Sequence, residues 1–303
     1  MAITAQDVKA LREMTGVGMM DCKKALAASD GNMDKAIEWL REKGLAASAK
    51  KAGRIAAEGM AYAADINGVG VVVEVNAETD FVGKNEKFVD FVKGVAATVA
   101  ACAPADLDSL MEYKYNGTDL TVTQQQQEMV LVIGENIKVR RFARFADGVS
   151  VPYIHAGGKI GVLVNLEVSG GIDATEIGKD MAMQIAALNP RFLDKSQVTQ
   201  EVLDEEKKIL LAQMDNDPKM ASKPEQVKEK IVVGKLNKFY AENCLLQQAF
   251  VKDGDVTVEQ YMNAAAKKLG GTVTLKDAVR FEKGEGIEKK QENFAEEIAK
   301  LTQ

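Results

Sequence analysis

Residues 74–82 of the chain read EVNAETDFV, and this stretch decides how the surrounding sequence folds. It continues an apolar run, Val71–Val75, that is typical of a buried strand. Beyond the stretch, five apolar residues recur at the spacing of one helical face: Phe88, Phe91, Val92, Val95 and Val99. The pattern therefore predicts a strand, a sharp corner and a helix, with the aromatic residue Phe81 at the corner.

A large aromatic side chain at this corner has two interpretations. In the first, Thr79 or Asp80 caps the helix and Phe81 staples the helix to the core. In the second, Asp80 and Phe81 project from the corner as a wedge that enters a partner. Local chemistry alone favours the first interpretation, because caps and staples are common at helix starts.

Composition narrows the class of protein. The chain has 303 residues, of which 46% are hydrophobic, enough for two or three small domains. No apolar run approaches the ~20 residues that span a bilayer, and no apolar signal segment begins the chain, so we expect a cytoplasmic protein with no membrane contact. The three cysteines are odd in number and far apart, which favours reduced thiols. A net charge of −6 argues against a nucleic-acid partner.

The residues needed for common catalytic and cofactor sites are missing from the sequence. The single histidine, His155, argues against a histidine-based zinc site and against catalysis that uses several histidines. The phosphate-loop pattern Gly-x-x-x-x-Gly-Lys-Ser/Thr does not occur, and the Gly-x-Gly pairs lack a third glycine at the required place. We therefore expect no enzyme activity, no metal, no cofactor and no direct nucleotide binding, and His155 alone is most simply a structural side chain.

The first 44 residues predict three short helices. Thr4 is placed to cap the first helix, Gly16 to break it, and Gly44 to end the third. Such a trio resembles the ubiquitin-associated fold of many binding modules. Residues 45–57 are small and basic without an apolar stripe, and they predict a linker that is helical in part.

Residues 58–284 contain a diverged internal repeat. Tyr62–Val75 aligns with Tyr153–Leu166, so that tyrosine, glycine and a run of branched apolar residues recur in the same order. Each copy predicts a hairpin of two strands that turns at glycine, at Asn67-Gly68 in the first copy and at Gly157-Gly158 in the second.

The repeat continues beyond the hairpins. Helices are predicted over residues 86–101 and about 174–188, and a later strand over 137–145 resembles residues 273–281. The second copy is longer, and residues 198–241 account for the difference as two helices joined by a turn. These residues predict an antiparallel helical hairpin that projects from the body.

The sequence thus predicts an α+β fold of five parts. They are a three-helix N-terminal domain (1–44), a linker (45–57), a first core subdomain (58–147), a second core subdomain (148–284) with a helical hairpin inserted at about 197–241, and a C-terminal helix (285–303). The last part carries Phe294, Ile298 and Leu301 on one stripe.

Two motifs in this sequence resemble those of the elongation factor Ts family, which exchanges guanine nucleotide on the GTPase elongation factor Tu. One motif is EVNAETDFV at residues 74–82, and the other is LREMTGVGMMDCKKAL at residues 11–26. The resemblance continues along nearly the whole chain and is weakest at residues 104–120. Gly83 departs from the alanine or serine expected there, which should loosen the corner.

The resemblance implies a translation elongation factor that binds elongation factor Tu carrying GDP, disturbs its Mg²⁺ and phosphate site, and promotes GDP release so that GTP can bind. It assigns the wedge that dislocates Mg²⁺ to Thr79, Asp80, Phe81 and Val82. It assigns contact with the partner's nucleotide domain to Arg12, Met19 and Met20. It places His155, in the second core unit, against the partner's third domain. It also implies that the helical hairpin is a coiled-coil arm.

The repeat supports the wedge, because Asp80-Phe81 aligns with Gly171-Ile172 and the acid–aromatic pair occurs in one copy only. Two other classes stay open. One is a ubiquitin-associated-like adaptor whose N-terminal domain binds any partner. The other is a ribosome- or RNA-binding protein that uses the slightly basic residues 1–57.

Overall fold

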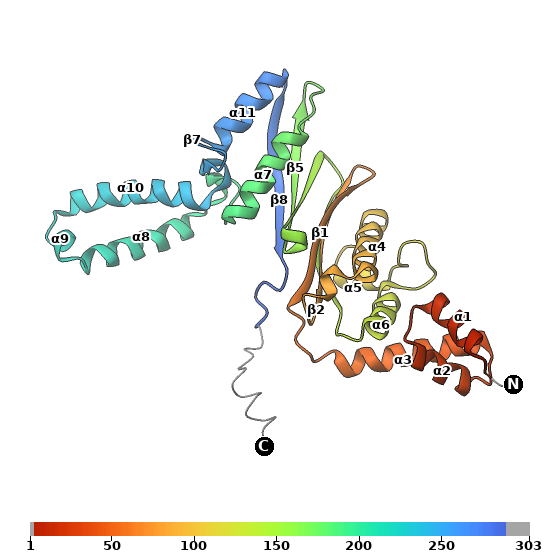
Figure 1. Cartoon of the computed structure of the whole chain (residues 1–303). Coiled ribbons are helices and arrows are strands. Elements are labelled where there is room, and N and C mark those ends of the chain that lie inside the picture. Colours follow the sequence, from red (N-terminus) through yellow and green to blue (C-terminus); the bar gives the residue numbers. More distant parts are fainter. Residues whose placement is uncertain (1–2, 289–303) are drawn as a thin grey trace.

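A computed structural model of the chain describes residues 3–288 (Figure 1). The described residues form both helices and antiparallel sheets, which confirms the predicted α+β class. Among these residues, no helix has the length and apolar character needed to cross a membrane. Most of the predicted C-terminal helix at 285–303, with Phe294, Ile298 and Leu301, lies outside the described residues. The division of the chain into domains stays a prediction.

The N-terminal head consists of three helices: α1 (Ala5–Thr15), α2 (Met19–Ala28) and α3 (Met33–Lys51). Thr4 caps α1 as predicted, since its hydroxyl accepts a hydrogen bond from the Asp7 N–H at 3.2 Å and its own N–H donates to the Asp7 carboxylate at 2.9 Å. Gly16 ends α1 with φ of 69°. The three helices share a small core that includes Leu11, Leu26, Ala36 and Leu40.

The predicted end of the third helix at Gly44 is wrong, because α3 continues to Lys51 and takes up half of the predicted linker. Gly44 is buried where α3 packs on α6 (Val122–Ile133). A Cβ atom on Gly44 would lie only 3.2 Å from the Gln127 carbonyl oxygen. The glycine therefore permits close approach between two helices, and this contact favours continued helix over the intrinsic preference of glycine.

Two three-stranded antiparallel sheets form the centre of the molecule. The first contains β1 (Glu58–Ile66), β2 (Val69–Ala77) and β3 (Lys138–Phe145), with β2 in the middle. The second contains β4 (Val149–His155), β5 (Ile160–Ser169) and β8 (Thr272–Glu282), with β5 in the middle. The hairpins turn at Asn67-Gly68 and at Ala156–Gly158, where positive φ angles are adopted.

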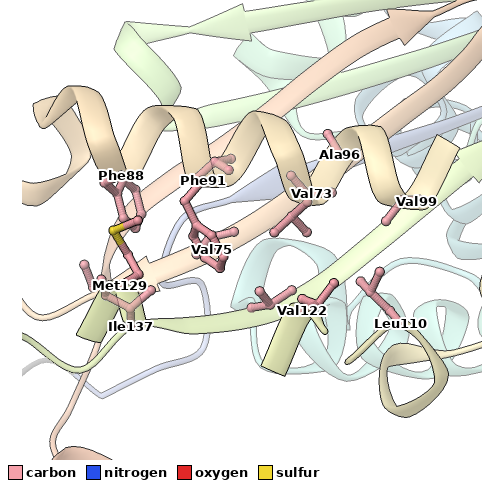
Figure 2. Close-up of a cluster of buried hydrophobic side chains, with 14 of the residues drawn as sticks. Val73, Val75, Phe88, Phe91, Ala96, Val99, Leu110, Val122, Met129 and Ile137 are labelled. Atoms are coloured by element: carbon pink, nitrogen blue, oxygen red, sulfur yellow. The ribbon is translucent and has the colours of Figure 1, made fainter. Parts of the chain in front are cut away.

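The two sheets pack face to face, and helices cover their outer faces (Figure 1). The interface between the sheets combines small residues such as Ala61 and Ala63 with larger ones such as Leu163 and Phe281. The backbones approach closely at a glycine, since a Cβ atom on Gly161 would lie 3.1 Å from the Ala61 backbone. α4 (Glu86–Cys102) covers the first sheet, and α7 (Thr175–Leu188) and α11 (Val258–Leu269) cover the second. In Figure 2, Phe91 of α4 lies beside Val75 of β2, and Phe88 of α4 lies beside Met129 of α6.

Two helices that sequence periodicity does not predict, α6 and α11, also belong to the internal repeat. α6 and α11 both begin at a threonine followed by valine, with glutamine three residues after the threonine. In each, the threonine and glutamine form reciprocal capping bonds, through Thr121 and Gln124 or through Thr257 and Gln260. A short helix α5 (Leu107–Glu112) closes the first core beside α6.

The arm consists of α8 (Gln200–Asp215), α9 (Pro218–Ala221) and α10 (Glu225–Asn243), which extend away from the body (Figure 1). Val198, Phe239 and Cys244 form a buried cluster at its base, and Leu210, Met214 and Val232 form another along its length. The strands β6 (Ala249–Phe250) and β7 (Asp253–Thr257) then return the chain to α11.

Candidate functional site

The corner, residues 78–85, joins the end of β2 to the start of α4. Asn85 caps α4, since its side-chain oxygen accepts hydrogen bonds from the Lys87 N–H at 3.0 Å and the Phe88 N–H at 3.4 Å. Residues 82–84 form a single 3₁₀ turn that leads into this cap. Neither Thr79 nor Asp80 caps the helix, so that part of the first interpretation is wrong.

The side chains of Phe81 and Val82 have opposite environments. Phe81 is 80% exposed, which excludes its role as a staple. Val82 is 6% exposed and packs in the core between β2 and α4. Of the four residues that the resemblance assigns to the wedge, Thr79, Asp80 and Phe81 lie at the surface and Val82 anchors the corner from below. Their binding roles stay predictions.

Gly83 brings the corner against β1. A Cβ atom at Gly83 would lie 2.8 Å from the carbonyl oxygen of Gly59. Gly59 itself has φ of 106°, and its own Cβ would lie 2.2 Å from the Val75 carbonyl oxygen. The expectation that Gly83 loosens the corner is therefore wrong, because the glycine permits a close backbone contact that a larger residue would obstruct.

Glu135, in the loop between α6 and β3, holds the other side of the corner. Its carboxylate accepts hydrogen bonds from the Glu78 N–H at 3.1 Å, the Thr79 N–H at 3.0 Å and the Thr79 hydroxyl at 2.7 Å. Sequence reasoning missed Glu135, because neither its spacing nor its neighbours in the chain connect it with the corner.

The head meets the corner at the first turn of α4. The Lys87 ammonium donates to the Gly16 carbonyl oxygen at 3.1 Å. The loop that follows Gly16 leads into α2, where Met19 is 53% exposed and Met20 is 65% exposed. The predicted contact residues of the head therefore begin beside the helix that follows Phe81.

Two further residues of α1 border this region. Arg12, a predicted contact residue, lies exposed in the last turn of α1. Met14 is 65% exposed and was missed, although it belongs to the same motif at residues 11–26. An exposed methionine can adapt to an irregular surface, because its thioether side chain is unbranched and flexible.

His155 lies exposed at the end of β4, where its Nδ1 is 3.1 Å from the Tyr153 hydroxyl. The hairpin tip beyond it packs on β1, since a Cβ atom at Gly158 would lie 2.7 Å from Met60 Cγ. Met60 is adjacent to Gly59, which contacts the corner at Gly83. The structure therefore brings the head, the corner and this hairpin tip together at one end of the paired sheets.

A groove of ≈ 390 Å³ separates the head from the core beside Met14. Arg41 and Glu128 face each other across it at 3.4 Å. Burial raises the pKa of Glu128, and the neighbouring Arg41 opposes that effect. Among residues 3–288, no cluster of three or more His, Cys, Asp or Glu side chains is arranged to hold a metal ion.

A buried carboxylate joins the two sheets beneath this end of the molecule. Glu74 of β2 is fully buried and accepts hydrogen bonds from Arg140 at 2.9 Å and from the Gly284 N–H at 2.8 Å. Arg141 donates a further bond to its second oxygen. Burial alone would raise the pKa of Glu74, but hydrogen bonds from Asn76, the Gly284 N–H and the two arginines together lower it.

Comparison with known proteins gives a consistent result. Residues 78–285 match the family model described as Elongation factor TS. The chain is 48% identical to Elongation factor Ts of Syntrophotalea carbinolica, with 100% of each chain covered. It is 49% identical to Elongation factor Ts of Clostridium kluyveri, with 98% of each covered. It is 50% identical to that of Clostridium perfringens, with 99% of each covered.

Proposed function

The chain belongs to the elongation factor Ts family and is a translation elongation factor, and we propose that it accelerates the release of GDP from elongation factor Tu. A translational GTPase holds GDP through backbone amides around the phosphates and through Mg²⁺. A factor that speeds release binds the empty GTPase more tightly than the loaded one. By linkage, nucleotide then weakens the binding of the factor to the same degree.

One observation carries the proposal: Phe81 is 80% exposed on a corner that is fixed at both ends. An exposed aromatic on a fixed backbone loses little conformational entropy when it enters an apolar pocket. We propose that Phe81 enters such a pocket on the GTPase and that Asp80 presses beside it. The displaced elements of the GTPase then no longer hold Mg²⁺ and GDP.

The remaining contact residues surround the corner. Arg12, Met19 and Met20 hold the nucleotide domain of the partner from the side of the head, and His155 contacts its third domain. The head then acts as a ubiquitin-associated-like module, and the two core subdomains place it and the hairpin tip around one partner. The reaction makes and breaks no covalent bond, needs no cofactor of its own, and takes place in the cytoplasm with translation.

The test measures release of a fluorescent GDP analogue from elongation factor Tu in the presence of excess unlabelled GDP. Sub-stoichiometric amounts of the chain should raise the rate in proportion to its concentration. Leu269→Ala, which removes an exposed apolar side chain on α11 away from the corner, should leave the rate unchanged. An unaltered release rate with the intact chain would contradict the proposal and favour the adaptor or RNA-binding classes.

A further inference from the structure

The ladder between β2 and β3 ends with the pair Asn76 and Lys138. Two residues further along both strands, Glu78 and Asn136 would be partners, but side chains replace the backbone bonds there. The Glu78 carboxylate accepts a hydrogen bond from the Asn136 N–H at 2.6 Å, while Glu135 accepts bonds from the Glu78 and Thr79 N–H groups. Each of the two segments thus supplies a carboxylate that accepts hydrogen bonds from backbone N–H groups of the other.

Arg54 pairs with Glu78, and its positive charge offsets part of the repulsion between the two acidic side chains. Its guanidinium lies 3.4 Å from the Glu78 carboxylate, and its carbonyl oxygen accepts a bond from the Asn136 side chain at 2.7 Å. The segment after α3 therefore reaches the corner as well. Charge-assisted bonds to successive backbone N–H groups are stronger than neutral ones and fix the direction of the chain.

These bonds act on the residues immediately before Asp80. On the other side of the projecting pair, Val82 is buried and Gly83 contacts Gly59. Asp80 and Phe81 are therefore two exposed residues between two fixed points. We infer that Glu135 is a positioning residue: through Thr79 it sets the direction in which Phe81 enters the partner. This inference rests on the proposed exchange function.

The fold has other means of holding the elements around the corner. Asn85 caps α4, the β2–β3 ladder extends to Asn76, and Val82 lies in the core. Glu135 is only half-buried and Thr79 is exposed, so their bonds protect little apolar surface. Loss of the Glu135 carboxylate should accordingly change the corner more than the stability of the body.

The experiment compares GDP release from elongation factor Tu with the wild type, Glu135→Ala and Glu135→Gln. Alanine removes all three bonds and should slow the stimulated release about tenfold, which corresponds to roughly 1.4 kcal/mol. Glutamine keeps an acceptor oxygen for the two N–H groups and should retain most of the rate. Glu112→Ala, the same truncation at an exposed position at the end of α5, should leave the rate unchanged.

A double-mutant cycle with Phe81→Ala separates positioning from general damage. If Glu135 acts through Phe81, Glu135→Ala should have almost no further effect once Phe81 is truncated. Amide exchange of Glu78 and Thr79, measured without the partner, should be slow in the wild type and fast in Glu135→Ala.

Three outcomes overturn the inference in distinguishable ways. Full stimulation by Glu135→Ala, with Phe81→Ala inactive, contradicts the positioning role of Glu135 but is consistent with the exchange function. Equal losses from Glu135→Ala with and without Phe81 show a role that does not pass through Phe81. No stimulation by the wild type contradicts the exchange function itself, and the positioning role with it.

Discussion

Phe81 and Val82 are neighbours in the chain, yet one side chain lies in water and the other in the core. The 3₁₀ turn that begins at Val82 produces this reversal, because it turns the chain away from the strand direction immediately after Phe81. At this scale, the proposed binding residue and a core residue are adjacent side chains. Substitutions at the corner can therefore separate the two properties.

Phe81→Ala should reduce exchange and leave stability nearly unchanged. Truncation of an anchoring aromatic costs about 2 kcal/mol of binding, roughly a thirtyfold loss. The free energy of unfolding should change by no more than about 0.5 kcal/mol, as for other exposed positions. Denaturant titration and GDP release measure the two effects on the same protein.

The matched control is Phe88→Ala, since Phe88 is fully buried in the first core beside Met129 (Figure 2). That change should lower the free energy of unfolding by about 3–5 kcal/mol. A loss of stability at Phe81 as large as that at Phe88, with exchange intact, would assign Phe81 to the core.

Gly83→Ala should destabilise the protein by about 1–3 kcal/mol, because the new Cβ would meet the Gly59 carbonyl oxygen at 2.8 Å and the backbone must shift. Gly234→Ala is the opposite case, because Gly234 lies within α10 and its Cβ would meet nothing within 4 Å. That change should stabilise by about 1 kcal/mol through helix propensity. Thermal or urea unfolding of both variants checks the contrast, and an unaltered midpoint for Gly83→Ala would contradict it.

At the scale of elements, sequence periodicity predicts the helices and strands whose apolar residues recur at regular spacing. It misses features that depend on contacts between distant segments. The hairpins, α4 and the arm follow from turns and apolar stripes. α6 was missed because a run of four glutamines, residues 124–127, obscures its apolar face, although its start matches that of α11. α3 passes through Gly44 where the helix packs against α6, a contact that no local pattern marks.

The same contrast between local patterns and distant contacts explains which residues of the candidate site could be predicted from the sequence. Two motifs in the sequence locate the exposed residues of the corner and the head, since those residues are contiguous. The bonds of Glu135 join segments that are far apart in the chain, and no local pattern marks them. Positioning residues of this kind become visible only when the strands are placed side by side.

The arm should be removable without loss of the body. Its two buried clusters are separate: one lies along the arm, and the other lies at its base around Val198 and Phe239. Replacing residues 205–237 by a short Gly/Ser link should preserve a single cooperative unfolding transition. Replacing residues 197–244 removes the base cluster and should destabilise the second core. Circular dichroism during denaturation measures both, and loss of cooperativity in the shorter replacement would contradict the prediction.

At the scale of the whole molecule, the two sheets are joined by polar groups as well as by apolar residues. Glu74 of the first sheet accepts a bond from the Gly284 N–H, just after the last strand of the second. A Cβ atom at Gly284 would lie 2.0 Å from the Ala57 carbonyl oxygen, so the backbone is in direct contact there. The last strand of the second sheet thus ends against the start of the first.

This junction makes stability depend on pH in a defined direction. The pKa of Glu74 is lowered from 4.5 in the folded protein, so its contribution is complete above about pH 4.5 and is lost as pH falls through the folded pKa. Glu74→Gln should lower the free energy of unfolding at pH 7 by about 3 kcal/mol, because Arg140 and Arg141 lose their carboxylate partner.

Urea midpoints between pH 7 and pH 3 measure this effect. The difference between wild type and Glu74→Gln should shrink as the pH falls below about 4.5. Glu112→Gln, at an exposed glutamate, should follow the wild type throughout. A difference in urea midpoint between wild type and Glu74→Gln that stays constant with pH would show that folding does not lower the pKa of Glu74.

The continuous helix α3 has a mechanical consequence. It runs from the head to Lys51, and in the segment between Lys51 and the start of β1 at Glu58 the Arg54 guanidinium contacts Glu78 of the corner, so a continuous helix and an ion pair connect the head to the corner. When a stiff body and a softer one are pressed together, deformation concentrates in the softer one. Under the proposed exchange function, we expect a connection that resists bending to direct the strain of binding into the nucleotide site of the GTPase.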